Sequence, residues 1–431
     1  MLSAFASAFR TPDLRKKLLF TLSIIALFRL GSVVPTPGVD YKAIQTCISL
    51  VQDNSLYGLI NLFSGGALLQ LSVFALGIMP YITASIIIQL LTVVIPRLES
   101  LRQEGQSGQA KLTQYTRYLT IGLAVLQSTG IIALARVPGR LFQGCNESLL
   151  VSNDISLVLT MVFVMTAGTG VIMWLGENIT DKGVGNGMSL LIFTSIIATF
   201  PGQLWQIGTI NGAFTLLLVL LVGVFIIAGV VYVEQAQRRI PVQYAKRMVG
   251  RRMYGGTSTY IPLKVNMAGV IPVIFASSLL YIPTLLVSLS GNQGDVAQWI
   301  SRNLTRGDEP LYMALYALLI IFFTYFYVAI TFNPTEVADN MKQYGGFVPG
   351  IRAGKPTAEY LDYVLTRITL PGSMYLAIIA IIPFAAFAYL GVGQRFLFGG
   401  TSLLIMVGVG LDTVKQIESQ LQQRNYEGFL R

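Results

Sequence analysis

The uncharged run from Asn54 to Pro96 reads NSLYGLINLFSGGALLQLSVFALGIMPYITASIIIQLLTVVIP. One membrane-spanning helix needs ~20 apolar residues, so the 43 residues from 54 to 96 are about twice the required length. We expect the run to break at Ser64-Gly65-Gly66, which leaves a short half-helix near 57–70 ahead of a full span near 73–95. Irregular backbone at membrane depth is tolerated where protein buries it. The half-helix is therefore expected inside the protein or, with equal weight, flat on the outer membrane surface.

The rest of the chain has a membrane composition too. Of its 431 residues 53% are hydrophobic and 12% are charged, whereas soluble domains carry roughly 25% charge. Arg29 interrupts the first apolar run, so we interpret that run as a retained helix and not as a cleaved signal peptide. The sequence predicts an all-α integral membrane protein with ten transmembrane helices, near 18–36, 73–95, 118–136, 155–175, 188–204, 213–233, 265–289, 311–332, 370–390 and 398–414.

Lysine and arginine positions predict the orientation, because these residues are enriched in cytoplasmic segments. With the N-terminus inside, 23 of the 30 basic residues fall in inner segments. Both termini of this multi-pass chain are therefore expected in the cytoplasm. Two long cytoplasmic loops are expected at about 234–264 and 333–368. Cys47 and Cys145 fall in outer loops, where a disulfide and two free thiols both remain open.

An internal repeat divides the chain. Gly77–Ile82 and Gly269–Ile274 both read G-x-x-P-x-I, in the second and seventh spans, and Gly187–Ile192 and Gly400–Ile405 both read G-x-S-L-L-I, in the fifth and tenth. Each pair is separated by five helices, and five is odd, so the halves would enter the membrane from opposite sides. We predict two inverted pseudo-symmetric halves, residues 1–206 and 207–431, with the functional site between them.

Isoleucines end each matched motif, and they are the candidates for that site. A secondary transporter of small solutes would place ionisable side chains at membrane depth, and the predicted span cores contain almost none. Stiff apolar residues suit a hydrophobic constriction that gates by dewetting. Any single isoleucine is more often a packing or lipid-facing residue, and only the pairing across the repeat favours a shared passage. The candidates are Ile82, Ile274, Ile192 and Ile405, which end the four motifs, and Ile78, which lies one turn before Ile82 on the same helix face.

Polar side chains in the second, third and seventh spans form a second feature. Such groups form hydrogen bonds across helix contacts, each of which stabilises the contact by ~1 kcal/mol or less. They can therefore hold two helices together while still allowing them to separate. Ordinary helix packing is the alternative interpretation. They are Ser85, Gln89 and Thr92, then Gln127, then Asn266, Ser277 and Ser278.

The inner loops carry basic residues on more chain than a connector needs. Long basic protrusions suit an acidic protein surface or RNA phosphates. The residues are Arg238, Arg239, Lys246, Arg247, Arg251, Arg252 and Arg352. No phosphate-binding loop accompanies them, since Pro356 follows Gly354-Lys355, and the chain has no histidine. We therefore expect no enzyme activity, no catalytic residue, no metal and no cofactor.

Four stretches resemble those of the bacterial SecY family, the central subunits of the Sec protein-conducting channel, and the likeness runs over essentially the whole chain. They are Ala75–Leu91 (ALGIMPYITASIIIQLL), Gly183–Gly187 (GVGNG), Val265–Pro272 (VNMAGVIP) and Phe347–Arg352 (FVPGIR). The resemblance implies that the half-helix is a plug, that the five isoleucines line a pore ring whose sixth position falls on Ser278, and that the polar residues lie at a lateral gate. The implied plug includes Leu59, Ile60, Leu62, Phe63, Ser64, Gly65 and Gly66.

The resemblance also implies partners. These are the small membrane subunits SecE and SecG, the SecA motor ATPase or a translating ribosome at the basic loops, signal-peptide-bearing substrates, and membrane lipids. The expected function is a passive channel that passes unfolded polypeptide across the membrane and releases hydrophobic segments sideways into lipid. A secondary transporter of small solutes is the alternative, and a scaffold without a conduit is a third class.

Overall fold

The computed structural model describes residues 9, 11–50, 64–137, 145, 147–244, 247–249, 252–254, 258–290, 295–304, 309–390 and 400–429. Most of these residues are helical, as predicted. The helices are α2 (Pro12–Val33), α3 (Tyr41–Leu50), α5 (Met79–Val94), α6 (Pro96–Gln103), α7 (Gln106–Ala135), α8 (Ile155–Lys182), α9 (Gly187–Gln235), α10 (Ile271–Ser290), α11 (Asp295–Asn303), α12 (Pro310–Thr331), α13 (Pro334–Gln343), α14 (Lys355–Leu390) and α15 (Gly400–Phe429).

Local signals explain where several helices begin. Proline lies in the first two positions of α2, α5, α6, α12 and α13, where its missing N–H would have no helical partner. The side chain of Asn186 accepts hydrogen bonds from the backbone of Met188 and Ser189 and so caps α9. Asn333 caps α13 in the same way.

By length and hydropathy, five helices of the described chain are long and apolar enough to cross a membrane, or six if the bent pair α5 and α6 is one span. The five are Gln106–Ala135, Ile155–Lys182, Gly212–Gln235, Pro310–Gln343 and Lys355–Ile382. The predicted number of ten spans therefore stays a prediction. The 101° bend between α5 and α6 falls before Pro96, a residue that disfavours helix in its predecessor.

Two spans begin later than predicted. The second was expected from residue 73 and the seventh from residue 265, but α5 starts at Met79 and α10 at Ile271. In both cases a glycine of the repeated motif lies two residues ahead of the helix in a left-handed conformation, with φ 56° at Gly77 and φ 61° at Gly269. Residues with a Cβ avoid this region, so the glycines mark the same break in both copies of the motif.

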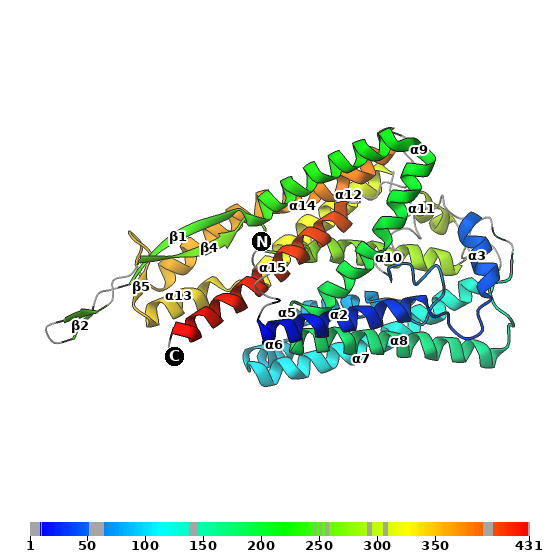
Figure 1. The fold of residues 1–431 in the computed structure, drawn as a ribbon. Helices are drawn as coiled ribbons and strands as arrows, with labels where there is room; N and C mark the ends of the chain where they lie inside the picture. The colour runs from blue at the N-terminus through cyan, green and yellow to red at the C-terminus, as the bar shows by residue number, and fades with distance from the viewer. Residues whose placement is uncertain are drawn as a thin grey trace.

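Helix α9 contains a break at Gly212, where φ is 83° and ψ 166°. The predicted fifth and sixth spans are its two arms, which Figure 1 shows as a sharp bend. The predicted boundary between the halves, 206/207, falls within the first arm, and the halves themselves stay a prediction.

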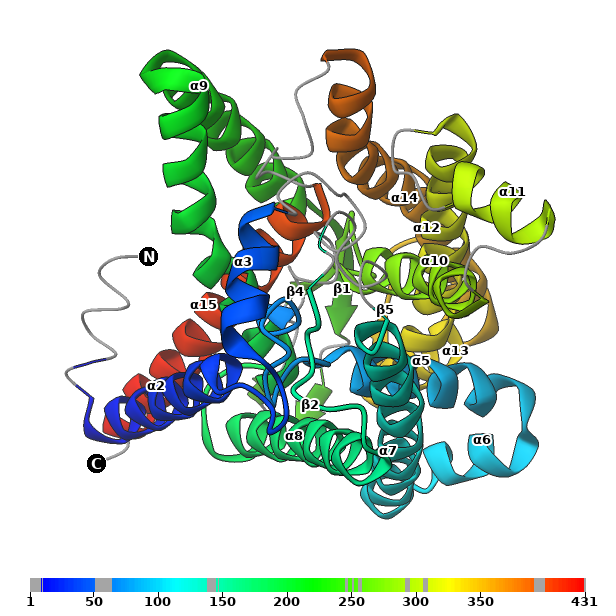
Figure 2. The same ribbon diagram turned by 90° about the vertical axis from the view of Figure 1, so that its right-hand side faces the viewer.

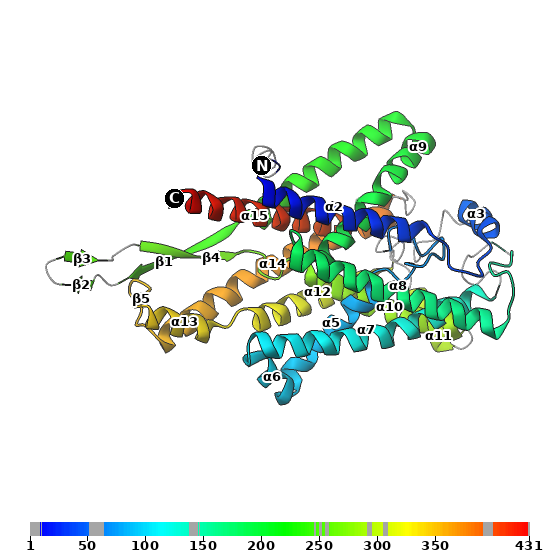
Figure 3. The same ribbon diagram turned by 60° about the horizontal axis from the view of Figure 1, so that its bottom comes forward.

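The molecule is elongated, with different structures at its two ends (Figures 1 and 3). A β-hairpin projects from one end, beside α13, the start of α2 and the last turns of α15. Helices α3 and α11 lie at the opposite end. Seen along the long axis, α2, α5, α7 and α8 form one group and α10, α12 and α14 another (Figure 2). Helices α5 and α10 contact each other across the groups and run in opposite directions, since α6 and α11 continue them toward opposite ends.

The described parts of the two long loops expected at about 234–264 and 333–368 form one protrusion. Strands β1 (Gln237–Tyr244) and β4 (Ser258–Lys264) pair antiparallel, with β2 (Arg247–Val249) and β3 (Arg252–Tyr254) at the tip. Strand β5 (Gly346–Phe347) comes from the second loop and pairs with the other edge of β1. The buried face of this sheet packs on α12, α13 and α14 through a cluster that includes Ile240, Val242, Leu263, Val328, Met341 and Leu361.

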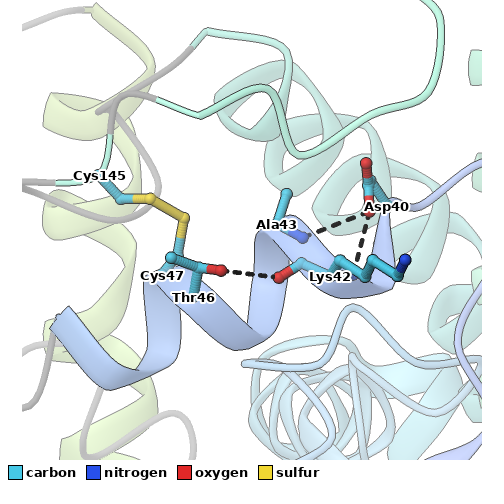
Figure 4. The surroundings of a disulfide bond; sticks show 6 residues. All are labelled: Asp40, Lys42, Ala43, Thr46, Cys47 and Cys145. Carbon is cyan, nitrogen blue, oxygen red and sulfur yellow. Dashed lines mark hydrogen bonds between the residues drawn. A yellow bond between two sulfur atoms is a disulfide. The ribbon is translucent and has the colours of Figure 1, made fainter.

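Cys47 of α3 and Cys145 form a disulfide, with their Cα atoms 5.4 Å apart (Figure 4). The side chain of Asp40 accepts from the backbone N–H groups of Lys42 and Ala43 at 3.0 and 3.3 Å and caps α3. The disulfide joins α3 to the connection between α7 and α8, and both cysteines are buried. The question that the sequence left open between a disulfide and two free thiols is thereby decided for the disulfide.

The disulfide gives the first prediction. Protein denatured without reductant is expected to take up no maleimide, and protein reduced first should take up two equivalents, because Cys47 and Cys145 are the only cysteines in the chain. Replacing both by alanine should lower the free energy of unfolding by about 2–5 kcal/mol. Mass spectrometry of the labelled chain checks the first outcome, and two maleimides without reductant would contradict it.

Candidate functional site

The five isoleucines singled out from the repeat lie in one buried hydrophobic cluster, which we call the central cluster. Each is at most 9% exposed. Four of them lie in four helices, Ile82 in α5, Ile192 in α9, Ile274 in α10 and Ile405 in α15, and Ile78 directly precedes α5. None of them faces the outside of the molecule.

Local backbone geometry explains how the matched residues reach the cluster. The N–H of Ile82 donates to the carbonyl of Ile78 at 3.1 Å, and the N–H of Ile274 donates to the carbonyl of Val270 at 3.3 Å. Both bonds form the first helical turn after the left-handed glycine. Ser278 lies one turn beyond Ile274, is buried, and donates its hydroxyl proton to the Ile274 carbonyl at 2.8 Å. This bond uses the hydroxyl proton of Ser278 within its own helix, so the side chain is less polar toward its surroundings than its residue type implies.

The described end of the predicted half-helix is held inside the protein. Ser64 is 2% exposed, and its hydroxyl accepts from the N–H of Leu68 at 3.2 Å. Gly65 and Gly66 both have left-handed φ angles, 64° and 94°, as expected for the predicted break. Leu59, Ile60, Leu62 and Phe63 lie outside the described residues.

Arg29 of α2 holds this segment. Its Nη1 atom donates to the carbonyl oxygen of Gly65 at 2.9 Å. A Cβ at Gly65 would lie 2.8 Å from that Nη1 and 3.0 Å from the Cα of Ser195 in α9, so Gly65 fits between two helices only as glycine. An arginine at this depth is costly unless it has a partner, and a turn carbonyl without a helical partner needs a donor. The bond satisfies both groups.

Helix α10 packs against both α5 and α7, and we call this contact the seam. Within the described chain, the hydrogen bonds of the predicted α5 residues stay inside that helix: Gln89 donates to Ser85 at 3.5 Å and Thr92 to the Gln89 carbonyl at 2.6 Å. Gln127 of α7 is half-buried. At the hairpin end, Arg102 of α6 donates to the carbonyl of Ile330 near the end of α12 at 2.5 Å.

Asn266 was expected on the seventh helix, and this placement is wrong. It precedes α10 and donates from Nδ2 to Glu234 of α9 at 2.6 Å and to the Gly269 carbonyl at 3.1 Å. Its amide thus supports the left-handed turn that starts the helix. Ser277 does lie on α10, but its hydroxyl contacts Tyr316 of α12 at 3.1 Å.

The predicted docking arginines that the structure describes are on the protrusion. Arg238 and Arg239 are exposed on β1, and the Arg239 guanidinium lies 4.8 Å from the centre of the Tyr260 ring on β4. Arg352 is exposed shortly after β5. Arg247 and Arg252 lie in β2 and β3, at the tip. Lys246 and Arg251 lie outside the described residues.

Sequence reasoning missed Tyr316 and Thr401, and it did not assign Arg29 a partner. A charge inside an apolar run was the available signal for Arg29. Among the described residues, no group of three or more acidic, cysteine or histidine side chains could hold a metal ion.

Comparisons with known proteins give matches over most or all of the chain. The family model for SecY matches residues 72–414. The protein translocase subunits SecY of Streptomyces scabiei and Mycobacterium bovis are 66% and 59% identical, each alignment covering all of both chains. A solved protein-conducting channel has the same fold, with TM-score 0.65 and 18% identity, covering 94% of this chain and 91% of the other. Sec61 in the canine ribosome-channel complex from the endoplasmic reticulum gives TM-score 0.62 and 17% identity, covering 94% and 91%.

The second prediction concerns Arg29. A cysteine placed at Ser64 should react slowly with a maleimide in the native protein, because that side chain is buried. Adding Arg29→Leu should speed labelling roughly tenfold or more, since the loss of a part-buried charge-assisted hydrogen bond costs about 1.5–3 kcal/mol and loosens the segment. Arg15→Leu, at an exposed position of the same helix, is the control. Equal labelling rates in the Arg29 and Arg15 variants would contradict the assignment.

Proposed function

The chain belongs to the SecY family and is the translocase subunit of a protein-conducting channel, and we propose that polypeptide passes through it at the central cluster. The chain is a multi-pass membrane protein and not an enzyme. The single observation that supports the route is that five isoleucines, four of them matched across the sequence repeat, are all buried in one hydrophobic cluster. The five, with Ser278 at a sixth position, form the pore ring.

An apolar ring suits this task physically. A narrow apolar constriction denies ions their hydration shell and excludes water when it is empty. Its side chains make no obligatory hydrogen bonds, so they can pack around many different residues of a passing chain. The segment around Ser64 and Gly65 acts as the plug, and its bond to Arg29 holds it in place while no substrate is present.

The seam of α10 against α5 and α7 is the lateral gate, through which a hydrophobic segment leaves for lipid. Because the hydrogen bonds of Ser85, Gln89 and Thr92 stay inside α5, opening the seam at these residues breaks few polar contacts. Gln127 completes the polar lining from α7. Arg102 joins the two sides at the hairpin end through Ile330.

The disulfide supports an orientation. Disulfides persist in oxidising compartments outside the cytoplasm, so the end of the molecule with α3 and Cys47 faces outward. The hairpin, the start of α2 and the end of α15 lie at the other end (Figure 3). We therefore place both termini and the basic protrusion in the cytoplasm of a bacterial cell.

The protrusion is the docking surface for the partner that drives translocation or that supplies the newly made polypeptide. Arg238, Arg239 and Arg352 lie on one sheet and its continuation because β5 pairs with β1. Exposed arginines recognise carboxylates and phosphates alike, so the SecA motor and the RNA of a ribosome both suit the surface. Among the structural neighbours, Sec61 is seen in a ribosome-channel complex. SecE and SecG are proposed as small membrane subunits beside the helices, and signal-peptide-bearing chains as substrates.

No observation favours a transporter of small solutes. Tight uptake coupled to an ion gradient needs ionisable or polar ligands around a central site, and the five isoleucines at the proposed route supply none.

The third prediction tests the ring. Ile82→Gly, Ile274→Gly and Ile405→Gly should each let ions leak through the purified channel in a planar bilayer, because a hole in the constriction admits water. Ile197→Gly and Ile378→Gly are matched controls, since these isoleucines are exposed, at 40% and 59%, in helices of the same chain. Ring variants that conduct no more than the controls would overturn the proposed route.

The fourth prediction tests the docking surface. Arg352→Ala should reduce SecA-driven export into proteoliposomes at least tenfold, while the amount of assembled channel and its resting conductance stay unchanged. Lys355→Ala is the control, since its side chain is 88% exposed close by and its loss removes the same charge. Normal export by the Arg352 variant would remove Arg352 from the docking site.

A further inference from the structure

Three hydroxyl groups from three helices meet beside the central cluster. Tyr316 of α12 is buried, and its hydroxyl lies 3.1 Å from the Oγ of Ser277 in α10 and 3.0 Å from the Oγ1 of Thr401 in α15. Ser277 also donates to the carbonyl of Val273 at 2.8 Å. The ring of Tyr316 belongs to the same buried cluster as Ile274 and Ile405.

The three groups can form one directed chain. Each hydroxyl has a single proton to donate and can accept. If Thr401 donates to Tyr316, Tyr316 to Ser277, and Ser277 to the Val273 carbonyl, every proton is used. Hydrogen bonds aligned in this way polarise one another in a low-dielectric interior, so the chain holds three helices in one relative orientation.

The spacing connects this chain to the pore ring. Ser277 follows Ile274 by three residues, and Thr401 precedes Ile405 by four. Residues three and four apart share a helix face. Holding the hydroxyl groups in place therefore also fixes the rotation of each helix about its axis, and with it the direction in which Ile274 and Ile405 point. Helix α10 packs mainly on α12, whereas α15 packs on α9 and α14. Tyr316 therefore couples two ring helices that pack chiefly on other neighbours.

We propose that Tyr316 is a positioning residue that sets the rotation of α10 and α15 and thereby keeps Ile274 and Ile405 in the pore ring. This inference rests on the proposed function. Tyrosine suits the role because its ring packs like any apolar side chain while its hydroxyl reaches two partners. With the hydroxyl removed, the aromatic ring of residue 316 still fills its space. The hydrogen bonds that join α10 and α15 through this residue are lost, so the two helices can rotate independently.

The test compares two tyrosines. Tyr316→Phe should raise the resting ion conductance of the purified channel roughly 3- to 10-fold, the range that corresponds to the loss of one or two interhelical hydrogen bonds in a membrane protein. The control is Tyr375→Phe in α14, because the Tyr375 hydroxyl is buried and has no hydrogen-bond partner within the described residues. It should leave conductance unchanged. Equal conductance in the two variants would overturn the proposal.

Variants of the partner keep the test decisive if Tyr316→Phe assembles poorly. Thr401→Val should leak, and Thr401→Ser, which keeps the hydroxyl, should not. The double variant Thr401→Val with Tyr316→Phe should raise the conductance by less than the product of the two single fold-changes, because both substitutions remove the same hydrogen bond. A fold-change equal to that product would overturn the coupling. Ile274→Gly in the same assay distinguishes a failure of the positioning role from a failure of the pore ring. If it leaks while Tyr316→Phe and Thr401→Val do not, only the positioning role fails; if it does not leak, the ring fails and the positioning role with it.

Discussion

The interior of a bilayer offers no hydrogen-bond partner to the peptide group, so protein atoms have to satisfy the backbone wherever a helix breaks at membrane depth. The segment from Ser64 to Ile78 is such a break. Its end near Gly65 is satisfied by Arg29. Further along, the Leu71 carbonyl accepts from the N–H of Thr36 at 3.0 Å, and the N–H of Val73 donates to the Val34 carbonyl at 2.9 Å. The broken backbone is thus paired with the chain that leaves α2.

This pairing has consequences for the centre of the molecule. Because the break is anchored on α2, helix α5 can start as late as Met79 and still present Ile78 and Ile82 to the central cluster. The second copy of the motif meets the same requirement with different atoms, since the Asn266 amide donates to the carbonyl of Gly269 ahead of α10. Both helices can therefore begin beside the central cluster with the backbone ahead of them paired to protein atoms.

Much of this arrangement could be predicted from the sequence, because it depends on local patterns. The break at Gly65 follows from the length of an uncharged run, and the buried isoleucines follow from a repeated motif. The late starts of α5 and α10 could not be predicted by hydropathy, since residues 73–78 are as apolar as the helix that follows; only the pairing of Gly77 with Pro80 hints at a turn.

Long-range contacts between polar side chains could not be predicted from the sequence for a different reason. Ser277 and Thr401 lie 39 and 85 positions from Tyr316, and no periodicity joins them. The two-residue strand β5 is too short to leave an alternating pattern, so the pairing of the two long loops in one sheet could be seen only in the structure. Asn266 was misplaced because its apolar neighbours suggested that the helix already included it.

The central claim is that polypeptide passes the pore ring, and site-directed crosslinking tests it most directly. A cysteine placed at Ile82 should form a disulfide with a single cysteine in an export substrate stalled halfway across the membrane, while a cysteine at the exposed Ile378 should not. Crosslinks from position 378 without any from position 82 would contradict the account.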